Sequence, residues 1–528
     1  MALPGETACH EVAPCPSSTW GDAPTDASTQ FVDVSYAAGD SDGSTRKPWP
    51  SIIAAVQAAA PGATIAIAAG DYYGTVSIDK PIRLWGRCPR LVTLSGLPTT
   101  TLEVLPGADG TEVHAIGLSG ALHGLLASGV SNLVIDRVWV HDLDGRGLHV
   151  SDDGLPADMT VRGSLIEGAG GFAVFSGGAR LVVEDTVVRD TRPLIPGDTA
   201  GRGLSFEEGT DTGAPAAGEV RNAVVVNNHD VGVYIAGASV DIEASLIGYT
   251  KPAVEPPSDR AVGVLVQSDT QGQLGGSLTL RQSSVVGDHG TGVRVVGSSL
   301  IAENVIVRDL LEGIAPVALG LHSREQPVTQ LPASVTVRAS LVTRVPGFGA
   351  QLTGESDLEG VAFRNIEPSA SGLAGRGLVI FRPVEVTAPT SANVRGCAID
   401  AVSEFGIAAI SCDVRVEDTL VRTVAAQSID GTFGDGLAVD GSRPPASLEL
   451  SHVRVEAAFR AGVSNFAAVV RLADSTFECD PIDLHGAGNR GPFSFEDLGG
   501  NVCGCGSATA PCKVLTADLE PPLEPDFP

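Results

Sequence analysis

Short runs in which apolar and polar residues alternate recur along most of the chain. One run covers residues 181–188, Leu-Val-Val-Glu-Asp-Thr-Val-Val, and the same template restarts at Val220 and at Ile242. Each run is about five residues long and is bounded by Gly, Asn, Asp or Ser, a pattern typical of short β-strands separated by turns. Such units bury their apolar side chains only against neighbouring units, so the pattern predicts a solenoid.

The length of the repeated unit alternates. Short units of about 22 residues alternate with long units of about 36 residues, and no helical runs lie between them. We therefore predict a coil of parallel strands in which successive rungs lie about 4.8 Å apart. The template restarts at Ile135, Val161, Val183, Val220, Ile242, Leu280, Ile301, Val337, Leu358, Val394, Val416, Leu450 and Leu472.

The residue that follows each restart predicts a ladder of charges. Acids and arginines alternate there, and opposite charges on neighbouring strands contribute roughly 0.2–1 kcal/mol per pair. A slip by one rung would bring like charges together, so we interpret the column as structural rather than as a catalytic row of acids. The column is Asp136, Arg162, Glu184, Arg221, Glu243, Arg281, Ala302, Arg338, Glu359, Arg395 and Glu417, with a break at Ala302.

The extra residues of the long units fall on both sides of one strand that begins with Gly. An example is residues 193–198 before Gly203 and residues 211–215 after it. Stacked units would place two rows of loops beside this strand. The strand then forms the floor of a long groove, unless the loops fold inward and cover it.

The Gly-led strands also predict which residues face the groove. The first residue after the Gly, for example Phe172, is expected to face inward, and the second, for example Ala173, is expected to face outward. The outward set includes a candidate binding strip for an extended polymer or a partner chain. The alternative is a solvated sheet face packed under its loops. The strip consists of Tyr234, Arg294, His322 and Gln351.

Four segments are predicted along the chain. Residues 1–30 form an N-terminal tail or cap, and residues 31–134 form an N-terminal cap with the first rungs. Residues 135–500 carry the β-helix repeats, and residues 501–528 form a Cys-bearing cap with a Pro-rich tail. Ser51 is predicted to N-cap a short helix over residues 52–60, which would plug the open end of the solenoid.

The opening of the repeat region resembles a known group of proteins. The relevant stretches are Pro50-Ser-Ile-Ile-Ala-Ala-Val, Pro61-Gly-Ala-Thr-Ile-Ala-Ile, Gly70-Asp-Tyr-Tyr and Val76-Ser-Ile-Asp-Lys-Pro-Ile-Arg-Leu-Trp-Gly. They resemble right-handed parallel β-helix repeat proteins of the pectin-lyase-like superfamily. The resemblance implies an all-β, single-stranded right-handed parallel β-helix of about 15 rungs with a short N-terminal capping helix. Because that superfamily includes lyases, hydrolases, epimerases, adhesins and proteins without known activity, it does not fix the function.

Charge narrows the possible partners. The chain of 528 residues has a formal net charge of −29. This charge disfavours nucleic acid and anionic membrane surfaces and favours solubility, divalent cations or basic partners. No apolar run approaches the roughly 18–20 residues needed to span a bilayer. The oligomeric state is not predicted.

Cysteine usage favours an oxidising compartment. Six of the nine Cys lie near the ends, and Cys9 and Cys15 are close enough in sequence to bridge. Cys479, Cys503, Cys505 and Cys512 predict two disulfides of open connectivity. We interpret the chain as an exported protein, extracellular or at a bacterial cell surface, although no apolar signal segment follows Met1. The alternative is a cytosolic protein with buried free thiols.

Catalytic chemistry has one weak candidate cluster. Residues 141–153 are rich in His and Asp and have the residue types for a base and a bound cation, but the alternative is a set of surface turn residues. The candidates are Asp142, Asp144, His149, Asp152 and Asp153. His229 and His289 occupy equivalent places two rungs apart, too far to share a metal. No cofactor is predicted, although weak Ca²⁺ binding by acidic loops stays open.

Two functions follow from this pattern. The first is an exported, non-catalytic β-helix that acts as a surface, adhesive or structural module. It would bind a polysaccharide or a protein partner through its loop-flanked groove. The alternative is a polysaccharide lyase or a glycoside hydrolase.

Overall fold

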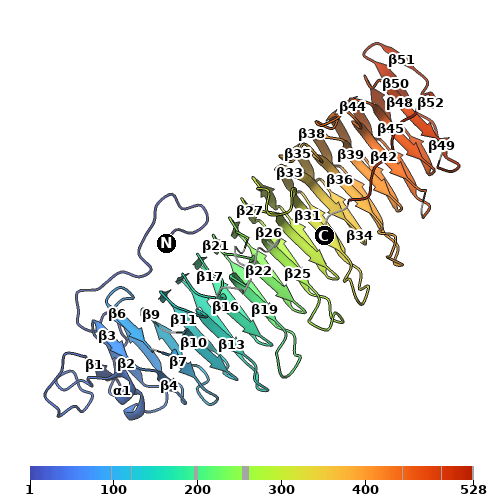
Figure 1. Cartoon of the computed structure of the whole chain (residues 1–528). Helices are drawn as coiled ribbons and strands as arrows, with labels where there is room; N and C mark the ends of the chain where they lie inside the picture. The colour runs from blue at the N-terminus through green and yellow to red at the C-terminus, as the bar shows by residue number, and fades with distance from the viewer. Residues whose placement is uncertain are drawn as a thin grey trace. The chain divides into compact units, whose positions relative to one another are not determined.

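The computed structural model describes residues 1–525 apart from 97, 121, 195–199, 253–260, 443 and 489. The chain divides into two units, unit 1 (Met1–Ser258) and unit 2 (Asp259–Pro528). Each unit is a stack of short parallel strands (Figure 1).

Each rung contains up to three strands, which belong to three different sheets. We name them sheet 1, sheet 2 and sheet 3, after the first, second and third strand of a rung. In one rung of unit 1 these are β17 (Arg180–Glu184), β18 (Val187–Arg189) and β19 (Arg202–Glu207). Each pairs in parallel with its counterpart in the next rung, which makes the chain a parallel β-helix. Parallel crossovers of this kind are right-handed in nearly all proteins.

Unit 1 contains the first strands of all three sheets. In sheet 1 lie β1 (Gln30–Val32), β2 (Thr64–Ile67), β5 (Arg83–Gly86), β8 (Glu112–His114), β11 (Leu133–Asp136), β14 (Asp158–Arg162), β17, β20 (Ala217–Arg221) and β23 (Ser239–Glu243). In sheet 2 lie β3 (Gly70–Tyr73), β6 (Val92–Ser95), β9 (Gly117–Ser119), β12 (Trp139–His141), β15 (Leu165–Glu167), β18, β21 (Val224–Val226) and β24 (Leu246–Gly248). In sheet 3 lie β4 (Val76–Ile78), β7 (Thr100–Val104), β10 (His123–Ser128), β13 (Leu148–Ser151), β16 (Phe172–Gly177), β19 and β22 (Val231–Ala236).

Unit 2 has the same plan, and β33 (Leu341–Leu352) runs through both sheet 2 and sheet 3. In sheet 1 lie β26 (Ser277–Arg281), β29 (Ser299–Glu303), β32 (Ser334–Arg338), β34 (Glu355–Glu359), β37 (Ser391–Arg395), β40 (Asp413–Glu417), β43 (Ser447–Ser451), β46 (Val469–Ala473) and β49 (Ser494–Asp497). In sheet 2 lie β27 (Ser284–Val286), β30 (Ile306–Arg308), β33, β35 (Ala362–Glu367), β38 (Ala398–Ser403), β41 (Leu420–Ala425), β44 (Arg454–Ala458), β47 (Thr476–Glu478) and β50 (Val502–Cys505), which pairs antiparallel with β51 (Ala508–Ala510). In sheet 3 lie β25 (Val262–Gln267), β28 (Thr291–Val296), β31 (Ala318–Arg324), β33, β36 (Arg376–Phe381), β39 (Phe405–Ile410), β42 (Asp435–Asp440), β45 (Ala461–Phe466), β48 (Ile482–Ala487) and β52 (Val514–Leu515).

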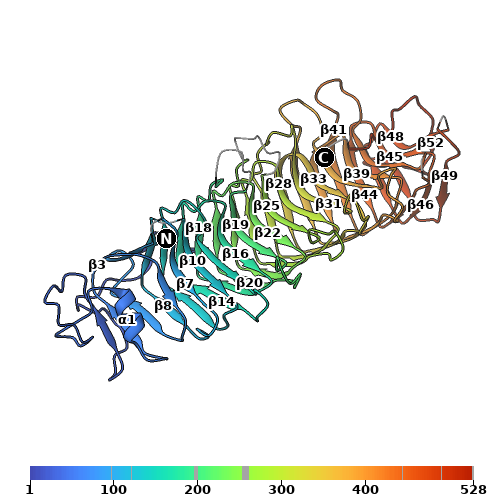
Figure 2. The same ribbon diagram turned by 60° about the horizontal axis from the view of Figure 1, so that its bottom comes forward.

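The helix α1 (Ile52–Ala58) packs against β1, β2 and β4 near the start of unit 1 (Figure 2). Ile52, Ala55 and Val56 are buried in this contact. Ser51 is the N-cap residue, but its side chain makes no capping hydrogen bond. The helix ends two residues before the predicted position, because Ala59 has already returned to an extended conformation.

The interior of each unit consists of stacked aliphatic side chains. Leu181, Val183 and Val220 are fully buried in unit 1, and Phe348, Phe363 and Phe405 are fully buried in unit 2. The loops that lengthen alternate rungs leave the coil on either side of sheet 3, as predicted. Residues 211–215 lie between β19 and β20, whereas residues 195–198 lie outside the described residues.

Three disulfides close the ends of the chain. Cys479 pairs with Cys505 and Cys503 pairs with Cys512, which confirms two disulfides in the C-terminal cap. The expected bridge between Cys9 and Cys15 is wrong. Cys15 bonds to Cys88 in the first rungs, and Cys9 is exposed with a free thiol. The N-terminal segment is therefore fixed to the coil and not to itself.

The charge ladder lies on sheet 1. In unit 1, Asp136, Arg162 and Glu184 occupy matching positions of successive strands, and Arg162 Nε donates to Asp136 at 3.0 Å. Glu184 in turn accepts a hydrogen bond from Arg221 at 3.0 Å. Each rung is thus registered against its neighbours by opposite charges.

The break expected at Ala302 is wrong. Ala302 is only 2% exposed and pairs with Leu280, whereas Glu303 pairs with Arg281 and Arg338. Ile301 is 40% exposed, so the apolar template of this rung begins one residue later than Ile301 suggests. The unit 2 ladder is Arg281, Glu303, Arg338, Glu359, Arg395 and Glu417.

The alternation of charge moves to a neighbouring column where this ladder ends at Ser451. Two residues earlier on the same strands, Arg415, Glu449, Arg471 and Glu496 lie in register. Glu449 accepts hydrogen bonds from Arg415 at 2.7 Å and from Arg471 at 3.1 Å, and Glu496 accepts one from Arg471 at 2.9 Å. The last rungs of unit 2 therefore keep an alternating column.

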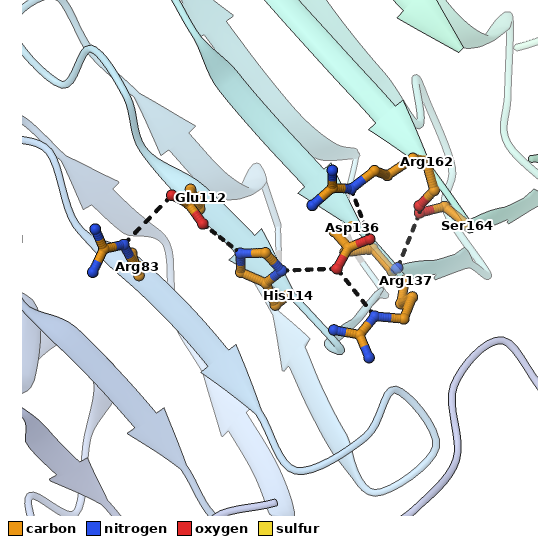
Figure 3. A network of polar contacts seen from close by, with 8 residues as sticks. Arg83, Glu112, His114, Asp136, Arg137, Arg162 and Ser164 are labelled. Atoms are coloured by element: carbon orange, nitrogen blue, oxygen red, sulfur yellow. Dashed lines mark hydrogen bonds and ion pairs between the residues drawn. The ribbon is translucent and has the colours of Figure 1, made fainter. Parts of the chain in front are cut away.

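The unit 1 ladder begins in a half-buried polar network (Figure 3). His114 lies between Glu112 and Asp136, with its ring nitrogens 2.7 and 2.9 Å from their carboxylates. Its ring stacks on Trp85 at 4.1 Å. Burial raises the pKa of Asp136, but the hydrogen bond from His114 and the charges of Arg137 and Arg162 outweigh it and hold that pKa well below its usual range.

Reversing one ladder charge should destabilise unit 2. We expect Arg338→Ala to cost about 0.5–1 kcal/mol and Arg338→Glu about 1–2 kcal/mol, because the introduced carboxylate would lie between Glu303 and Glu359. Thermal unfolding followed by circular dichroism measures the difference. Arg46→Glu, at an exposed position outside the ladder, is the control for net charge. Equal effects of the two glutamate variants would contradict a role for the ladder.

The Asp136 network should make unit 1 sensitive to acid. A carboxyl whose pKa is lowered by folding stabilises the fold above its unfolded pKa near 3.9, and that stability is lost as the pH falls towards the folded value. Asp136→Asn should cost about 1.5–3 kcal/mol at pH 7 and flatten the loss of stability below pH 4. Asp357→Asn, at an exposed pair, should cost about 0.5 kcal/mol. Denaturant unfolding between pH 2 and 7 checks both, and parallel pH profiles of wild type and Asp136→Asn would exclude this role.

Candidate functional site

The outward column of sheet 3 contains the predicted binding strip. In unit 1, His149, Phe175, Ser205 and Tyr234 occupy matching positions of successive strands. In unit 2, the column continues through Leu265, Arg294, His322, Gln351, Val379 and Ala408. The register therefore brings Arg294, His322 and Gln351 side by side on three consecutive rungs.

The orientations expected for Phe172 and Ala173 are wrong. Val174, not Phe172, aligns with Leu148 on the inward side, and Phe175 takes the outward place assigned to Ala173. Gly171 has a φ of 74° and belongs to the turn, so the inward position comes three residues after it, at Val174, and not one residue after the glycine as at Leu148. Phe172 instead packs its ring against the guanidinium of Arg146, 5.0 Å from its centroid.

Much of the outward face is covered. Tyr234 is 7% exposed, His322 3% and Gln351 1%. In unit 1, the guanidinium of Arg202 lies 3.5 Å from the centroid of the Tyr234 ring. In unit 2, Val379, Ala408 and Ala438 of the column join an apolar cluster with loop residues Ala374 and Phe433. The sheet face is thus packed under its loops over this stretch, and the open part of the groove is narrower than the loop pattern suggests.

Two adjoining pockets remain open on this face of unit 2. The larger, of about 450 Å³, is lined by His322, Gln351, Thr353, Phe381 and Arg324, among others. The smaller, of about 340 Å³, is lined by Arg294, Gln267, Asp269, Gln326 and the same Arg324. The two pockets share Arg324 as a lining residue, and we refer to them together as the trough over the rungs of β25, β28, β31 and β33.

Two side chains that line the larger pocket each carry a buried polar atom without a partner in the described structure. Among the described residues, neither Nδ1 of His322 nor Oε1 of Gln351 has a hydrogen-bond partner. Burial and the charges of Arg294 and Arg324 hold the pKa of His322 well below its ordinary value, so the imidazole is neutral. A buried polar group without a partner costs about 1–3 kcal/mol, so His322 and Gln351 are polar groups that the fold leaves unsatisfied beside the pocket.

The C-terminal segment forms one wall of the larger pocket. Glu524 and Pro525 line it together with Pro383 and Glu385. The segment is held through its backbone: Arg376 donates to the carbonyl of Leu523 at 3.3 Å, and Arg460 to that of Glu520 at 3.0 Å. This wall was not predicted, because the Pro-rich acidic sequence carries no strand or helix signal.

The predicted catalytic cluster does not converge. The side chains of Asp142 and Asp144 are 84% and 87% exposed. Asp142 pairs with His141, and Asp144 lies 3.6 Å from Arg192. In the described part of the chain, no hydrogen bond or ion pair joins any two of the five candidates.

The other three candidates lie in separate surroundings. His149 accepts a hydrogen bond from Arg146 at 2.7 Å, and burial together with the charge of Arg146 lowers the pKa of His149 to about 3. Asp152 is buried and accepts a hydrogen bond from the Thr212 hydroxyl, whereas Asp153 is exposed. None of them is placed to act on the same bond as another.

One carboxyl pair was missed by the sequence. Burial, together with the charge of nearby Asp483, raises the pKa of Asp480 to about 7. Burial also raises the pKa of Asp483. Oδ1 of Asp480 accepts a hydrogen bond from the backbone N–H of Ala458 at 2.7 Å, and its Oδ2 has no partner in the described structure. No local pattern marks such a pair, because the shift depends on how the last rungs bury it.

Two further possibilities are a metal site and a membrane-spanning helix. No group of three or more His, Cys, Asp or Glu among the described residues is placed to hold a metal ion. His229 is bonded through Nδ1 to the carbonyl of Thr191 at 2.8 Å. In the same described residues, no helix combines the length and the apolar character that a membrane span requires.

Comparison with known proteins gives distant structural similarity only. No family model matches the sequence, and no curated protein matches it. A pectate lyase, Pel9A, is 14% identical, with a TM-score of 0.39, over 59% of this chain and 75% of that one. An alginate lyase from Paenibacillus sp. is 17% identical, with a TM-score of 0.37, over 50% and 93%. The catalytic unit of an α-1,3-glucanase from Streptomyces thermodiastaticus is 13% identical, with a TM-score of 0.38, over 91% and 69%.

Proposed function

We propose that this parallel β-helix protein is exported and binds an extended polysaccharide along the trough on sheet 3 of unit 2. The observation that carries the proposal is the pair of buried polar side chains, His322 and Gln351, which line a pocket of about 450 Å³ and each keep one polar atom without a partner among the described residues. The three disulfides support export, because such bonds persist in oxidising compartments.

The chemistry of the trough suits sugar rings. A sugar hydroxyl both donates and accepts, so one ligand can satisfy a neutral imidazole, an amide oxygen and the Arg324 guanidinium together. Phe381 adds an apolar surface against which the C–H face of a ring can pack. Arg294 lines the next pocket, so a chain of linked sugars could continue from one rung to another. Tyr234 packs against the guanidinium of Arg202 in unit 1, and we propose that its ring fixes the position of that guanidinium.

Removing the polar atoms of the trough should weaken binding. We expect His322→Ala, Gln351→Ala and Arg324→Ala each to reduce affinity at least 10-fold, about 1.4 kcal/mol, because each removes a hydrogen-bonding group that lines the trough. Affinity electrophoresis against acidic and neutral polysaccharides measures the effect. His452→Ala, at a histidine whose side chain is 59% exposed on another face, is the matched control. Unchanged affinity in all three trough variants would refute the site.

Polysaccharide cleavage is the second candidate function, and Asp480 favours it. A carboxyl that keeps its proton near pH 7 can protonate a leaving oxygen. Asp483 provides the second carboxylate that glycoside hydrolysis uses. This pair lies in the last rungs of unit 2, on and beside β48, and a substrate in the trough would have to reach it along sheet 3.

Turnover assays separate cleavage from binding. On polygalacturonate, alginate and α-1,3-glucan, cleavage by Asp480 predicts product release that declines as the pH rises through about 7. It also predicts a fall of at least about 100-fold in Asp480→Asn. Asp142→Ala and Asp152→Ala test the other cluster, and loss of turnover in either of them but not in Asp480→Asn would move catalysis there. Binding without turnover on every substrate would support the non-catalytic function and contradict cleavage.

A further inference from the structure

The C-terminal segment 517–525 runs back along the outer face of sheet 3 in unit 2. The carbonyl of Ala517 lies 2.9 Å from Nε2 of His485 on β48. The chain then passes Arg460, just before β45, and Arg376 on β36. It ends with Glu524 and Pro525 at the pocket of His322 and Gln351. The segment therefore covers the same face that leads into the proposed polysaccharide site.

Few side chains of this segment contact the sheet beneath it. Its contacts with Arg376 and Arg460 use backbone carbonyls, and both arginines already have buried acidic partners, Glu404 and Asp435. Pro521 and Pro522 are buried, but Leu523 is 60% exposed. The segment is thus anchored by two proline rings and a few hydrogen bonds.

The charged end of the segment lies against like charges. Burial and the neighbouring carboxylates of Glu385 and Asp440 raise the pKa of Glu524. Like charges at short range repel, so this contact opposes docking of the end. An extended segment with few anchors and a repelled end can leave its position without unfolding the rungs beneath.

We propose that residues 517–525 form an intramolecular strap that competes with polysaccharide for the face of sheet 3 beside the His322–Gln351 pocket. The inference rests on the proposed binding function and concerns its regulation. A tethered competitor acts at an effective concentration in the millimolar range, so even weak docking lowers the apparent affinity. The apparent dissociation constant rises in inverse proportion to the fraction of molecules with the strap displaced.

Truncation after Thr516 tests the strap and leaves all three disulfides in place. We expect the truncated protein to bind polysaccharide at least 10-fold more tightly than the full chain. A synthetic peptide of residues 516–525, added in trans, should bind the truncated protein and reverse the gain. Fluorescence anisotropy of the labelled peptide and affinity electrophoresis provide the two measurements.

Point variants of the full chain test the strap independently, in case truncation disturbs folding. The double variant Pro521→Gly/Pro522→Gly should loosen the strap and raise the affinity of the full chain, because it removes two buried rings and frees the backbone. Leu523→Ala, at an exposed position of the same segment, should leave affinity unchanged. Equal affinity of full-length, truncated and glycine-substituted proteins would overturn the strap while the binding function stands. If none of them binds polysaccharide, the proposed function fails, and the peptide assay alone reports whether the segment docks.

Discussion

The register between successive parallel strands is the constraint on which the structure depends. Once each rung lies directly over the last, every position of the repeat becomes a column, and the column decides what a residue contacts. Inward columns accumulate aliphatic side chains such as Leu181 and Val183, which bury one another. Outward columns bring together residues more than 20 positions apart in sequence, such as Glu184 and Arg221. The same stacking that builds the core therefore also assembles the candidate site.

The site illustrates how register produces chemistry without a local motif. Arg294, His322 and Gln351 are spread over 58 residues and come from three strands, yet they occupy one column. The loops beside sheet 3 then cover some residues of the column and leave others next to a pocket. Val379 and Ala408 are sealed by an apolar cluster, while His322 and Gln351 keep unsatisfied polar atoms at a pocket. The proposed binding site is thus confined to the stretch where polar column residues line a pocket.

The fold could be predicted from the sequence because its signals are periodic and local. Strand positions, alternating rung lengths and the acid–arginine ladder all follow from spacing, and a single misplaced restart at Ile301 produced the false break at Ala302. The site could be predicted only in part. Which residues face outward follows from the period, but burial of Tyr234 under Arg202 depends on packing between side chains. The bridge from Cys15 to Cys88 and the return of the C-terminal segment join distant parts of the chain, and nothing in their local sequence records a partner.

The alternating column of sheet 1 limits how such a chain can change in length. Removing one rung between Glu303 and Glu359 would set two acids face to face, whereas removing two adjacent rungs would restore an acid next to an arginine. The long and short loops alternate with the same period of two rungs. Duplications or deletions that preserve stability should therefore add or remove two rungs at a time. The repeat unit on which evolution can act in this protein is thus a pair of rungs and not a single rung.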